Sequence, residues 1–290
     1  MSGVLFGIGV GAGSPDEITV RALSVIKDCK VLFFPSKNQE TCKAYQIAKQ
    51  AFPQLADKEL VFCDFPMSKD ENLLNATHNS ISDRICSFLS NNKNVGFLTL
   101  GDVALYSTFS YIDSIVKKRG FQTKMISGVS SVNAVAAALG IPLAKNSEEL
   151  HIIPQDFNLQ EIISKNYSGN LVFMKSGKKL SELKFFLQKN ADKIEFLGAV
   201  CNCGFEKERT AKKLSELDND FEYMTVAIAK IKSEKSKTQG KTREGQSFFQ
   251  NKACKSFPCH KIENPDDFNC LFCFCPLSYR SALLYIKCLF

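Results

Sequence analysis

GVLFGIGVGAGSPDE, residues 3–17, sets the architecture of the chain. Residues 3–10 are apolar or glycine, which is typical of a buried strand, and the helix-opening pair Ser14-Pro15 follows the glycines. A strand that runs through a glycine turn into a helix is a unit of an α/β fold. Glycine at alternate positions also lets the backbone turn sharply and pass close to a ligand or a neighbouring strand.

The same alternation of strand and helix continues along the chain. Apolar runs predict further strands at residues 31–34, 60–63, 95–100, 122–126, 150–153, 170–174, 195–200 and 223–231. Helical spacing of apolar residues predicts helices at residues 16–30, 41–50, 71–91, 106–119, 132–139, 180–190 and 208–217. The tightest boundary lies at Gly120, so we expect two α/β domains at residues 1–120 and 121–232, with the strand at 122–126 opening the second.

The end of the chain has a different composition. Residues 233–246 are polar and charged without apolar periodicity, which predicts a linker. Residues 247–290 form a small cysteine-rich segment, because six of the twelve cysteines fall in the last 37 residues. From Lys232 onward the net charge is +5, out of +7 for the whole chain. The body is therefore nearly neutral.

Composition and charge exclude several classes of protein. The chain has 290 residues, of which 44% are hydrophobic and 23% charged, a mixture typical of a globular protein. A nearly neutral body argues against nucleic-acid binding. The N-terminus has no signal-peptide pattern, and no apolar run is long enough to span a membrane. We therefore expect a cytoplasmic protein without nucleic-acid or membrane partners, in which reduced, clustered cysteines favour a metal over disulfides.

The glycine loop also has an alternative interpretation. Gly7, Gly9 and Ala12 fit the G-x-G-x-x-G/A pattern of a dinucleotide site. That fold needs an acidic residue at the end of its second strand to bind the ribose hydroxyls. The second strand here ends in FFPS, residues 33–36, without a carboxylate. This argues against an NAD-dependent oxidoreductase, and a plain strand–helix turn without a ligand stays open for this loop.

Three further segments follow expected strands, where ligands bind in open α/β sheets. LTLGDVALYSTF, residues 98–109, places Gly101-Asp102 after a strand. SGVSS, residues 127–131, brings hydroxyl groups to a helix N-terminus, where backbone amides are free to donate. CNCGFEKE, residues 201–208, follows a strand of the second half. Together with the glycine loop, these segments predict a ligand site.

With these segments in this order, the chain resembles the tetrapyrrole (corrin/porphyrin) methylase family. Residues 7–16 match the family's G-x-G-x-G-P-G-D-P-like opening, and residues 101–103 match its G-D-P/V motif. LYSTFSY, and CG-x-x-x-E at residues 203–208, are most similar to the branch that methylates C20 of precorrin-2 or cobalt-factor II in cobalamin biosynthesis. The resemblance covers about residues 3–231.

Two residues of the glycine loop depart from the family pattern. Ala12 stands where the family usually has proline, and Ser14 stands where it often has aspartate. These changes affect the rigidity of the loop more than its chemistry, and they weaken the case for a direct role of the loop.

The resemblance implies two α/β domains with a cleft for S-adenosylmethionine (SAM) between them, and a homodimer. Carried over position by position, the expected SAM-binding residues are Ala12, Gly101, Asp102, Val103, Leu105, Ser130, Ser131, Met174 and Gly204. The implied methyl acceptor is an already activated carbon of a tetrapyrrole. The enzyme therefore supplies alignment and exclusion of water, and no catalytic side chain is assigned. For Asp102, a general base and a partner for backbone amides both stay open.

The substrate of such an enzyme carries several carboxylates, which need basic partners. The candidates are Arg21, Lys37, Lys175 and Lys178, and the sequence does not choose among them.

The cysteine-rich segment has the ligand spacing of a metal site. Thiolates separated by one or two residues fit zinc or an iron–sulfur cluster. The segment resembles the cysteine-rich small domain that accompanies cobalamin-biosynthesis proteins. The candidate ligands are Cys254, Cys259, His260, Cys270, Cys273 and Cys275. A tail of reduced cysteines without metal is the alternative.

Two other functions remain for the whole chain. One is a tetrapyrrole methylase that acts at a different carbon, against which the LYSTFSY and CGFEKE segments argue. The other is a non-catalytic carrier of a metal or a tetrapyrrole, with the cysteine-rich segment as its working part.

Overall fold

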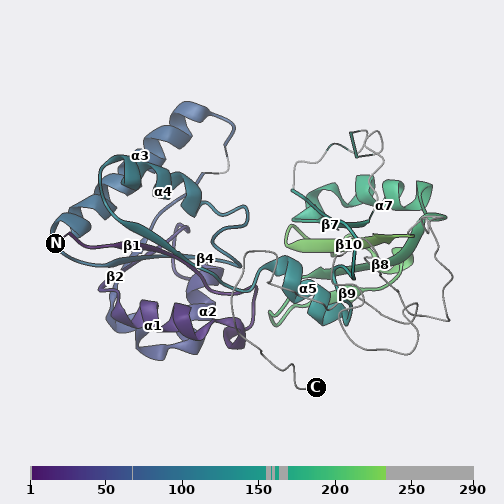
Figure 1. Cartoon of the computed structure of the whole chain (residues 1–290), viewed down its shortest axis with the longest axis horizontal. Helices are drawn as coiled ribbons and strands as arrows, with labels where there is room; N and C mark the ends of the chain where they lie inside the picture. Colours follow the sequence, from purple (N-terminus) through teal and green to yellow (C-terminus); the bar gives the residue numbers. More distant parts are fainter. Residues whose placement is uncertain (1, 67, 155–157, 159–160, 163–168, 233–290) are drawn as a thin grey trace, which may run out of the picture. The chain divides into compact units, whose positions relative to one another are not determined.

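Two five-stranded sheets organise the chain (Figure 1). The computed structural model describes residues 2–66, 68–154, 158, 161–162 and 169–232. Residues 1–233 form one unit, which contains both sheets, and residues 234–290 form a second unit that lies outside the described residues. The expected α/β architecture is confirmed for the first unit.

The first sheet is entirely parallel, with the strand order β3-β2-β4-β1-β5. Its strands are β1 (Leu5–Gly9), β2 (Val31–Phe34), β3 (Glu59–Phe62), β4 (Val95–Thr99) and β5 (Thr123–Ile126). All residues of β2 and β4 are buried. Such strands read as continuous apolar runs because helices cover both faces of a parallel sheet.

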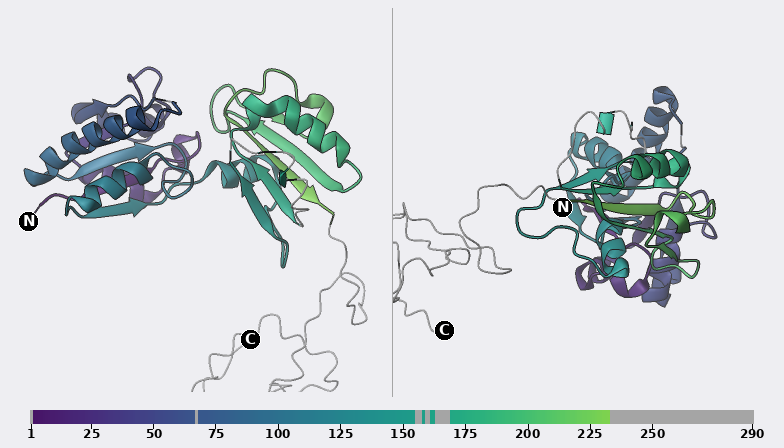
Figure 2. Two further views of the ribbon diagram at one scale, coloured as in Figure 1. Left: turned by 90° about the horizontal axis from the view of Figure 1, so that it is seen from above. Right: turned by 90° about the vertical axis from the view of Figure 1, so that its right-hand side faces the viewer.

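Helices cover the two faces of this sheet in pairs (Figure 2). They are α1 (Val20–Asp28), α2 (Lys43–Ala51), α3 (Glu71–Ser90) and α4 (Phe109–Lys118), with short 3₁₀ helices η1 (Pro15–Glu17) and η2 (Pro53–Asp57). α1 and α2 share one apolar cluster, whereas α3 and α4 share the cluster on the opposite face. The hydroxyl of Thr19 accepts the Ala22 amide at the start of α1, and Asp70 accepts two amides at the start of α3.

The order of the strands creates a crevice beside β1. β1 and β4 are neighbours, but their helical connections leave on opposite faces: α1 leads to β2 and α4 leads to β5. At such a switch point the loops after the two strands separate, and ligands of open α/β sheets bind there, beyond the carboxyl ends of the strands. The fold therefore selects the loops after β1, β4 and β5 as the place for a site.

The second sheet is mixed and has the order β6-β7-β10-β8-β9. Its strands are β6 (Leu150–Ile153), β7 (Asn170–Phe173), β8 (Ile194–Cys201), β9 (Arg209–Ala211) and β10 (Thr225–Ile231). Only β6 and β7 pair in parallel among these strands. α5 (Ser131–Leu139) covers one face and α7 (Leu180–Lys189) the other, with 3₁₀ helices η3 (Ser176–Lys179) and η4 (Leu214–Glu216) beside them.

Two sequence-based expectations are wrong. The strand at 122–126 does not open the second half, because β5 pairs with β1 in the first sheet, and the change of sheet therefore comes after Ile126. The helix expected at 208–217 is absent. Residues 209–211 pair with β8 instead, and the guanidinium of Arg209 lies 2.8 Å from carboxylate oxygens of both Asp218 and Asp220. Pairing with the preceding strand, β8, overrides the local helix preference.

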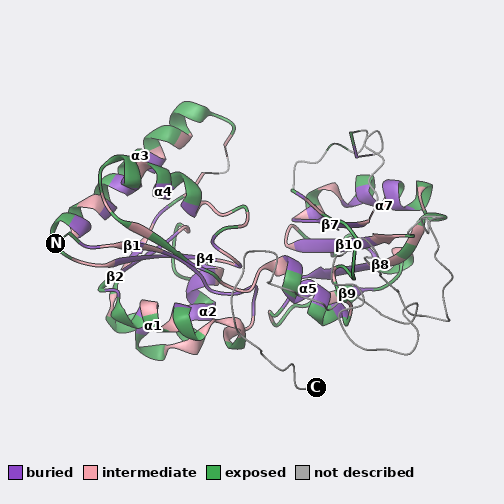
Figure 3. Ribbon diagram, in the orientation of Figure 1, coloured by how far each residue is buried: buried purple, intermediate pink, exposed green. Residues whose placement is uncertain are grey.

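The strands and the inner helix faces are buried, and the outer helix faces are exposed (Figure 3). No helix within the described ranges is long and apolar enough to cross a membrane.

Phe97 on β4 tests the core of the first sheet. It is fully buried, and its ring centroid lies 5.7 Å from that of Phe109 and 5.9 Å from that of Phe65. Phe97→Ala is expected to lower the free energy of unfolding by about 3–5 kcal/mol, because it removes buried apolar area and leaves a cavity. Urea denaturation measures this change. Phe185→Ala, at a phenylalanine that is 60% exposed, is the control, and equal losses for both variants would contradict the assignment of the core.

Candidate functional site

Glycine backbones bring the loops after β1, β4 and β5 together. Gly11 and Gly101 form an isolated bridge, in which the Gly101 amide donates to the Gly11 carbonyl at 2.7 Å. A Cβ on Gly9 would lie 2.6 Å from the Gly101 carbonyl oxygen and 2.7 Å from the Gly128 nitrogen. No side chain fits at that distance. The alternating glycines therefore allow close contact between the loops as well as a sharp turn.

Asp102 fastens two of these loops together. Its Oδ1 accepts the Ala104 amide at 2.8 Å, and its Oδ2 accepts the Gly128 amide at 2.9 Å. Both carboxylate oxygens are therefore occupied by backbone donors, one from its own loop and one from the loop after β5. This geometry favours a partner for backbone amides over a general base, the two roles that the sequence left open.

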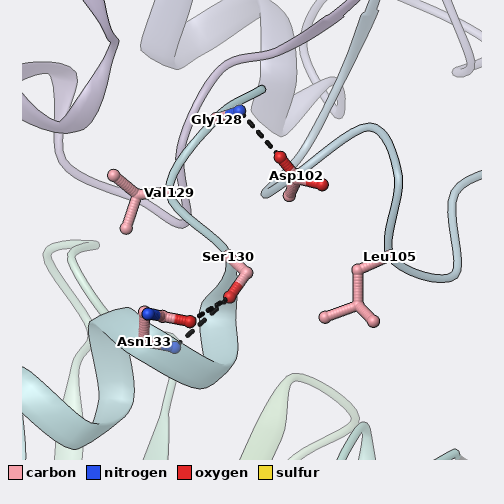
Figure 4. A pocket seen from close by; sticks show the side chains of 6 residues that line it. All are labelled: Asp102, Leu105, Gly128, Val129, Ser130 and Asn133. Carbon is pink, nitrogen blue, oxygen red and sulfur yellow. Dashed lines mark hydrogen bonds between the residues drawn. The ribbon is translucent and has the colours of Figure 1, made fainter. Parts of the chain in front are cut away.

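A pocket of about 350 Å³ lies beside this contact (Figure 4). Its volume falls within the range of small-molecule sites. The lining residues are Asp102, Leu105, Gly128, Val129, Ser130 and Asn133. Three of the expected SAM-binding residues, Asp102, Leu105 and Ser130, are thus brought together. The pocket combines an apolar wall with hydroxyl, amide and carboxylate groups.

Asn133 is a lining residue that the sequence analysis did not select. Ser130 is the N-cap of α5, and its Oγ lies 2.8 Å from Asn133 Oδ1 and accepts the Asn133 amide at 3.3 Å. Ser131 is half-buried in the first turn of the same helix. The sequence did offer a signal for this residue. Asn133 lies three residues after a serine N-cap, a position at which a polar side chain is held close to the cap.

The apolar side of the site connects the two sheets. Ala12 and Met174 are buried in one cluster with the inner face of α5, and the pocket residues Leu105 and Val129 pack against that cluster. Val103 differs, because its side chain is buried with Phe109 in the cluster beneath α3 and α4. Among the expected apolar contacts, therefore, Ala12 and Met174 lie next to the pocket wall, whereas the Val103 side chain is core.

The turn after β8 packs directly on the glycine loop. A Cβ on Gly204, whose φ is +75°, would lie 2.5 Å from the Ser14 nitrogen. The Gly204 amide donates to Glu208 at 2.7 Å, and the Ala12 amide donates to Glu17 at 3.1 Å. Each of these two loops thus has a carboxylate that accepts one of its own amides. The structure therefore brings Gly204 and Ala12 to one place, although they are far apart in the sequence.

Lys43 connects the two sheets at the same turn. Its Nζ donates to Asn202 Oδ1 at 3.0 Å and lies 4.4 Å from the centroid of the Phe205 ring. Burial lowers the pKa of Lys43, partly offset by the negative charge of Glu222. Asn202 has a left-handed backbone, with φ at +51°, which asparagine tolerates better than most residues. Lys43 was not among the expected site residues.

The cysteine of this turn is not a nucleophile. Burial, together with the negative charges of Glu208 and Glu17, raises the pKa of the Cys203 thiol to about 12. The thiol is therefore protonated at neutral pH, whereas attack by cysteine requires the thiolate.

The isolated histidines contact neighbouring side chains. His78 is buried, and its ring stacks on Tyr111 at 4.8 Å between centroids. His151 Nε2 lies 3.3 Å from Glu149 Oε2.

The candidate metal ligands in the cysteine-rich segment, Cys254, Cys259, His260, Cys270, Cys273 and Cys275, lie outside the described residues. Within the described ranges, no group of three or more His, Cys, Asp or Glu side chains is placed to hold a metal ion.

Two curated relatives match the sequence of this chain over nearly their whole length. The chain is 35% identical over 230 residues to the "Probable cobalt-precorrin-2 C(20)-methyltransferase" of Methanocaldococcus jannaschii. The matched stretch covers 78% of this chain and 95% of the relative. It is 28% identical over 224 residues to the cobalt-precorrin-2 C(20)-methyltransferase of Salmonella typhimurium, which covers 76% of this chain and 92% of the relative.

Solved structures share the fold at lower identity. A cobalt precorrin-4 methyltransferase matches with a TM-score of 0.61 at 16% identity, over 78% of this chain and 94% of that one. The uroporphyrin-III C-methyltransferase of Thermus thermophilus matches with a TM-score of 0.58 at 18% identity, over the same shares.

Family models match both parts of the chain. The model of a cysteine-rich small domain matches residues 245–282, which include all six candidate metal ligands. The model of the tetrapyrrole (corrin/porphyrin) methylases matches residues 4–218, which carry all four loops of the site. The chain therefore belongs to the tetrapyrrole (corrin/porphyrin) methylases.

Proposed function

We propose that this chain transfers the methyl group of SAM to C20 of a cobalt-containing tetrapyrrole, cobalt-precorrin-2 or cobalt-factor II, in cobalamin biosynthesis. One observation carries the proposal: 35% identity over 95% of a relative that is named for this reaction. The relative with 28% identity bears the same activity in its name. The family match and the pocket at the switch point of the first sheet agree with such an enzyme.

The residues of the pocket fit SAM as the methyl donor. Leu105 and Val129 offer an apolar wall for a base, and Ser130 and Asn133 offer hydrogen-bonding groups. SAM supplies a methyl group on a positively charged sulfur, and the Asp102 carboxylate places negative charge at this pocket. We propose that Ala12, Gly101, Val103, Ser131, Met174 and Gly204 complete the donor site, through backbone groups and through the apolar cluster beside the pocket.

The roles of these residues follow from their contacts. Asp102 holds the loops after β4 and β5 at a fixed separation, because each of its oxygens accepts an amide. Leu105, Val129 and Met174 exclude water from the donor. Alignment and dryness accelerate a displacement between two reactants that are already activated. No residue of the described chain needs to act as a nucleophile in this scheme.

Other substrates are favoured less by the relatives. A precorrin-2 C(20)-methyltransferase of a Sinorhizobium species is 23% identical over 66% of its length, so a metal-free substrate is the second candidate. A precorrin-6A synthase of the same genus is 28% identical over 58% of its length, so methylation at another carbon ranks lower. A non-catalytic carrier is disfavoured because the loops of the site are intact.

The proposal extends to the assembly, the compartment and the C-terminal segment. We propose a homodimer in the cytoplasm without nucleic-acid or membrane partners, which rests on family resemblance and on the nearly neutral body. We also propose that residues 247–290, connected by a linker at 233–246, bind zinc or an iron–sulfur cluster. The match to a cysteine-rich small domain and the ligand spacing support this.

Methyl transfer can be tested directly. The chain is incubated with SAM and with either cobalt-loaded or metal-free sirohydrochlorin, and the product mass is followed. We expect a gain of one methyl group with the cobalt complex. Gain with the metal-free compound alone would assign the second candidate, and no gain with either would overturn the proposed function. NMR with a ¹³C-labelled methyl group identifies the carbon, and a position other than C20 would assign a different methylase.

Asp102→Ala tests the donor site. The variant loses both amide contacts of the carboxylate, and we expect at least a tenfold increase in the dissociation constant of S-adenosylhomocysteine, about 1.4 kcal/mol or more, by calorimetry. Asp64→Ala is the control, because Asp64 is exposed and its ion pair with Lys37 spans 3.4 Å. Unchanged affinity in the Asp102 variant would remove this residue from the site.

The cysteine-rich segment can be tested in the full chain. Elemental analysis of the purified protein is expected to find zinc or iron, and the double variant Cys270→Ser/Cys273→Ser is expected to lose it. Methyl transfer should persist, because every expected donor-binding residue lies within residues 12–204. Cys29→Ser, at a buried cysteine of the first unit, is the control for a general effect of losing a thiol. A wild-type protein without metal would contradict the assignment.

A further inference from the structure

Two lysines approach one aromatic ring at the end of β7. Lys178 Nζ lies 5.1 Å from the centroid of the Tyr223 ring, and Lys175 Nζ lies 5.7 Å from it. Lys175 directly follows Met174, which is buried in the apolar cluster against which the pocket residue Leu105 packs. The pair is therefore continuous in the chain with the wall of the proposed donor site. Attraction to the face of the ring holds both ammonium groups near it.

The backbone beneath this group is fixed. Ser176 is fully buried, and its Oγ donates to the Thr225 carbonyl at 3.2 Å. A Cβ on Gly177 would lie 1.8 Å from the Glu222 carbonyl oxygen, so the turn at 175–179 packs tightly on the segment that carries Tyr223. The two lysines and the ring thus belong to one preorganised unit and not to two independent surface segments.

Lys175 also has a strained backbone. Its φ is +51° and its ψ is +38°, in the left-handed region that glycine adopts without cost. A residue with a Cβ is destabilised there, and such residues gather at binding sites. A glycine would satisfy the turn, so the lysine side chain needs another reason to be there.

Neither lysine of the pair forms an ion pair in the described part of the chain. None of the ion pairs found there includes Lys175 or Lys178. Glu222 is next to Tyr223 in sequence, but it is exposed, and its charge acts on Lys43. By contrast Lys37, another basic candidate from the sequence, is paired with Asp64. A carboxylate is a natural partner for ammonium groups that form no ion pair within the protein.

We propose that Lys175, Lys178 and Tyr223 form a subsite for a carboxylate of one of the two reactants. The inference rests on the proposed function, because the tetrapyrrole carries acetate and propionate groups and SAM carries an α-carboxylate. The chemistry of the subsite is the same for both sources. Of the four basic candidates from the sequence, the proposal assigns this role to Lys175 and Lys178, which lie on the same rigid turn.

Binding measurements separate the two sources. Lys175→Gln/Lys178→Gln is compared with the wild type for the affinity of S-adenosylhomocysteine, by calorimetry, and of cobalt-sirohydrochlorin, by absorbance titration. Loss of the pair is expected to weaken one ligand about tenfold. Weaker tetrapyrrole binding assigns the substrate carboxylate, and weaker S-adenosylhomocysteine binding assigns the donor. Lys49→Gln is the matched control, because Lys49 Nζ lies 5.7 Å from the centroid of the Tyr45 ring.

A second variant excludes a merely structural role. Lys175→Gly relieves the left-handed strain and removes one cation, so its melting temperature should not fall while the affinity for the carboxylate ligand does. Lys175→Arg/Lys178→Arg should restore most of the affinity. Unchanged affinity for both ligands in the glutamine variant, or an equal loss in the Lys49 control, overturns the proposal.

These titrations need no turnover, so they also separate the two proposals. A wild type that binds the tetrapyrrole but does not methylate it would contradict the proposed function and leave the subsite supported if the glutamine variant binds more weakly. A wild type that binds neither ligand would contradict both.

Discussion

The structure depends on one steric constraint: backbone approaches backbone with no room for a side chain. A Cβ on Gly9 or on Gly128 would collide with the main chain of the other and with the Gly101 carbonyl. This contact lies beyond the carboxyl ends of three adjacent strands, where parallel topology separates the loops. The Asp102 carboxylate then spans the contact with two accepted amides. The shape of the pocket follows from these close approaches.

The same constraint joins the second sheet to the first. Gly204 lies against the loop of Gly13 and Ser14, again through backbone contact. Lys43 adds a hydrogen bond and a ring contact to the turn that carries Gly204. Glu17 and Glu208 each accept an amide of their own loop, which fixes the shape of both loops. The two halves of the proposed donor site are therefore preorganised, which reduces the cost of binding.

Much of this arrangement could be read from local patterns. The glycine loop, the Gly-Asp pair after β4 and the serine cap of α5 have short-range signatures, and each lies where the sequence placed it. The family resemblance is likewise confirmed by the match over residues 4–218. These features were predictable because turns, caps and apolar strands depend mainly on neighbouring residues.

The errors concern the pairing of strands. β5 pairs with β1 in the first sheet, and the sequence of residues 123–126 does not indicate which strand it will pair with. β9 forms where a helix was expected, because β8 offers an open edge. Lys43 was missed for a related reason, because its partner Asn202 lies in a turn remote in sequence. Asn133 is held locally by the Ser130 cap, and only its place in the pocket beside Asp102 depends on a distant loop. Sequence patterns report the local preference and not the identity of the partner.

The close glycine contacts also determine which residues of the site can be substituted. At Gly9 and Gly128 nearly any replacement alters the main chain, so this part of the proposed donor site can tolerate little change while the protein stays folded. Lys175, Lys178 and Tyr223 contribute side chains on a support that other residues fix. Residues of that kind can be exchanged without disturbing the main chain. The end of β7 therefore marks a change from positions where the main chain limits substitution to positions where the side chain alone can change.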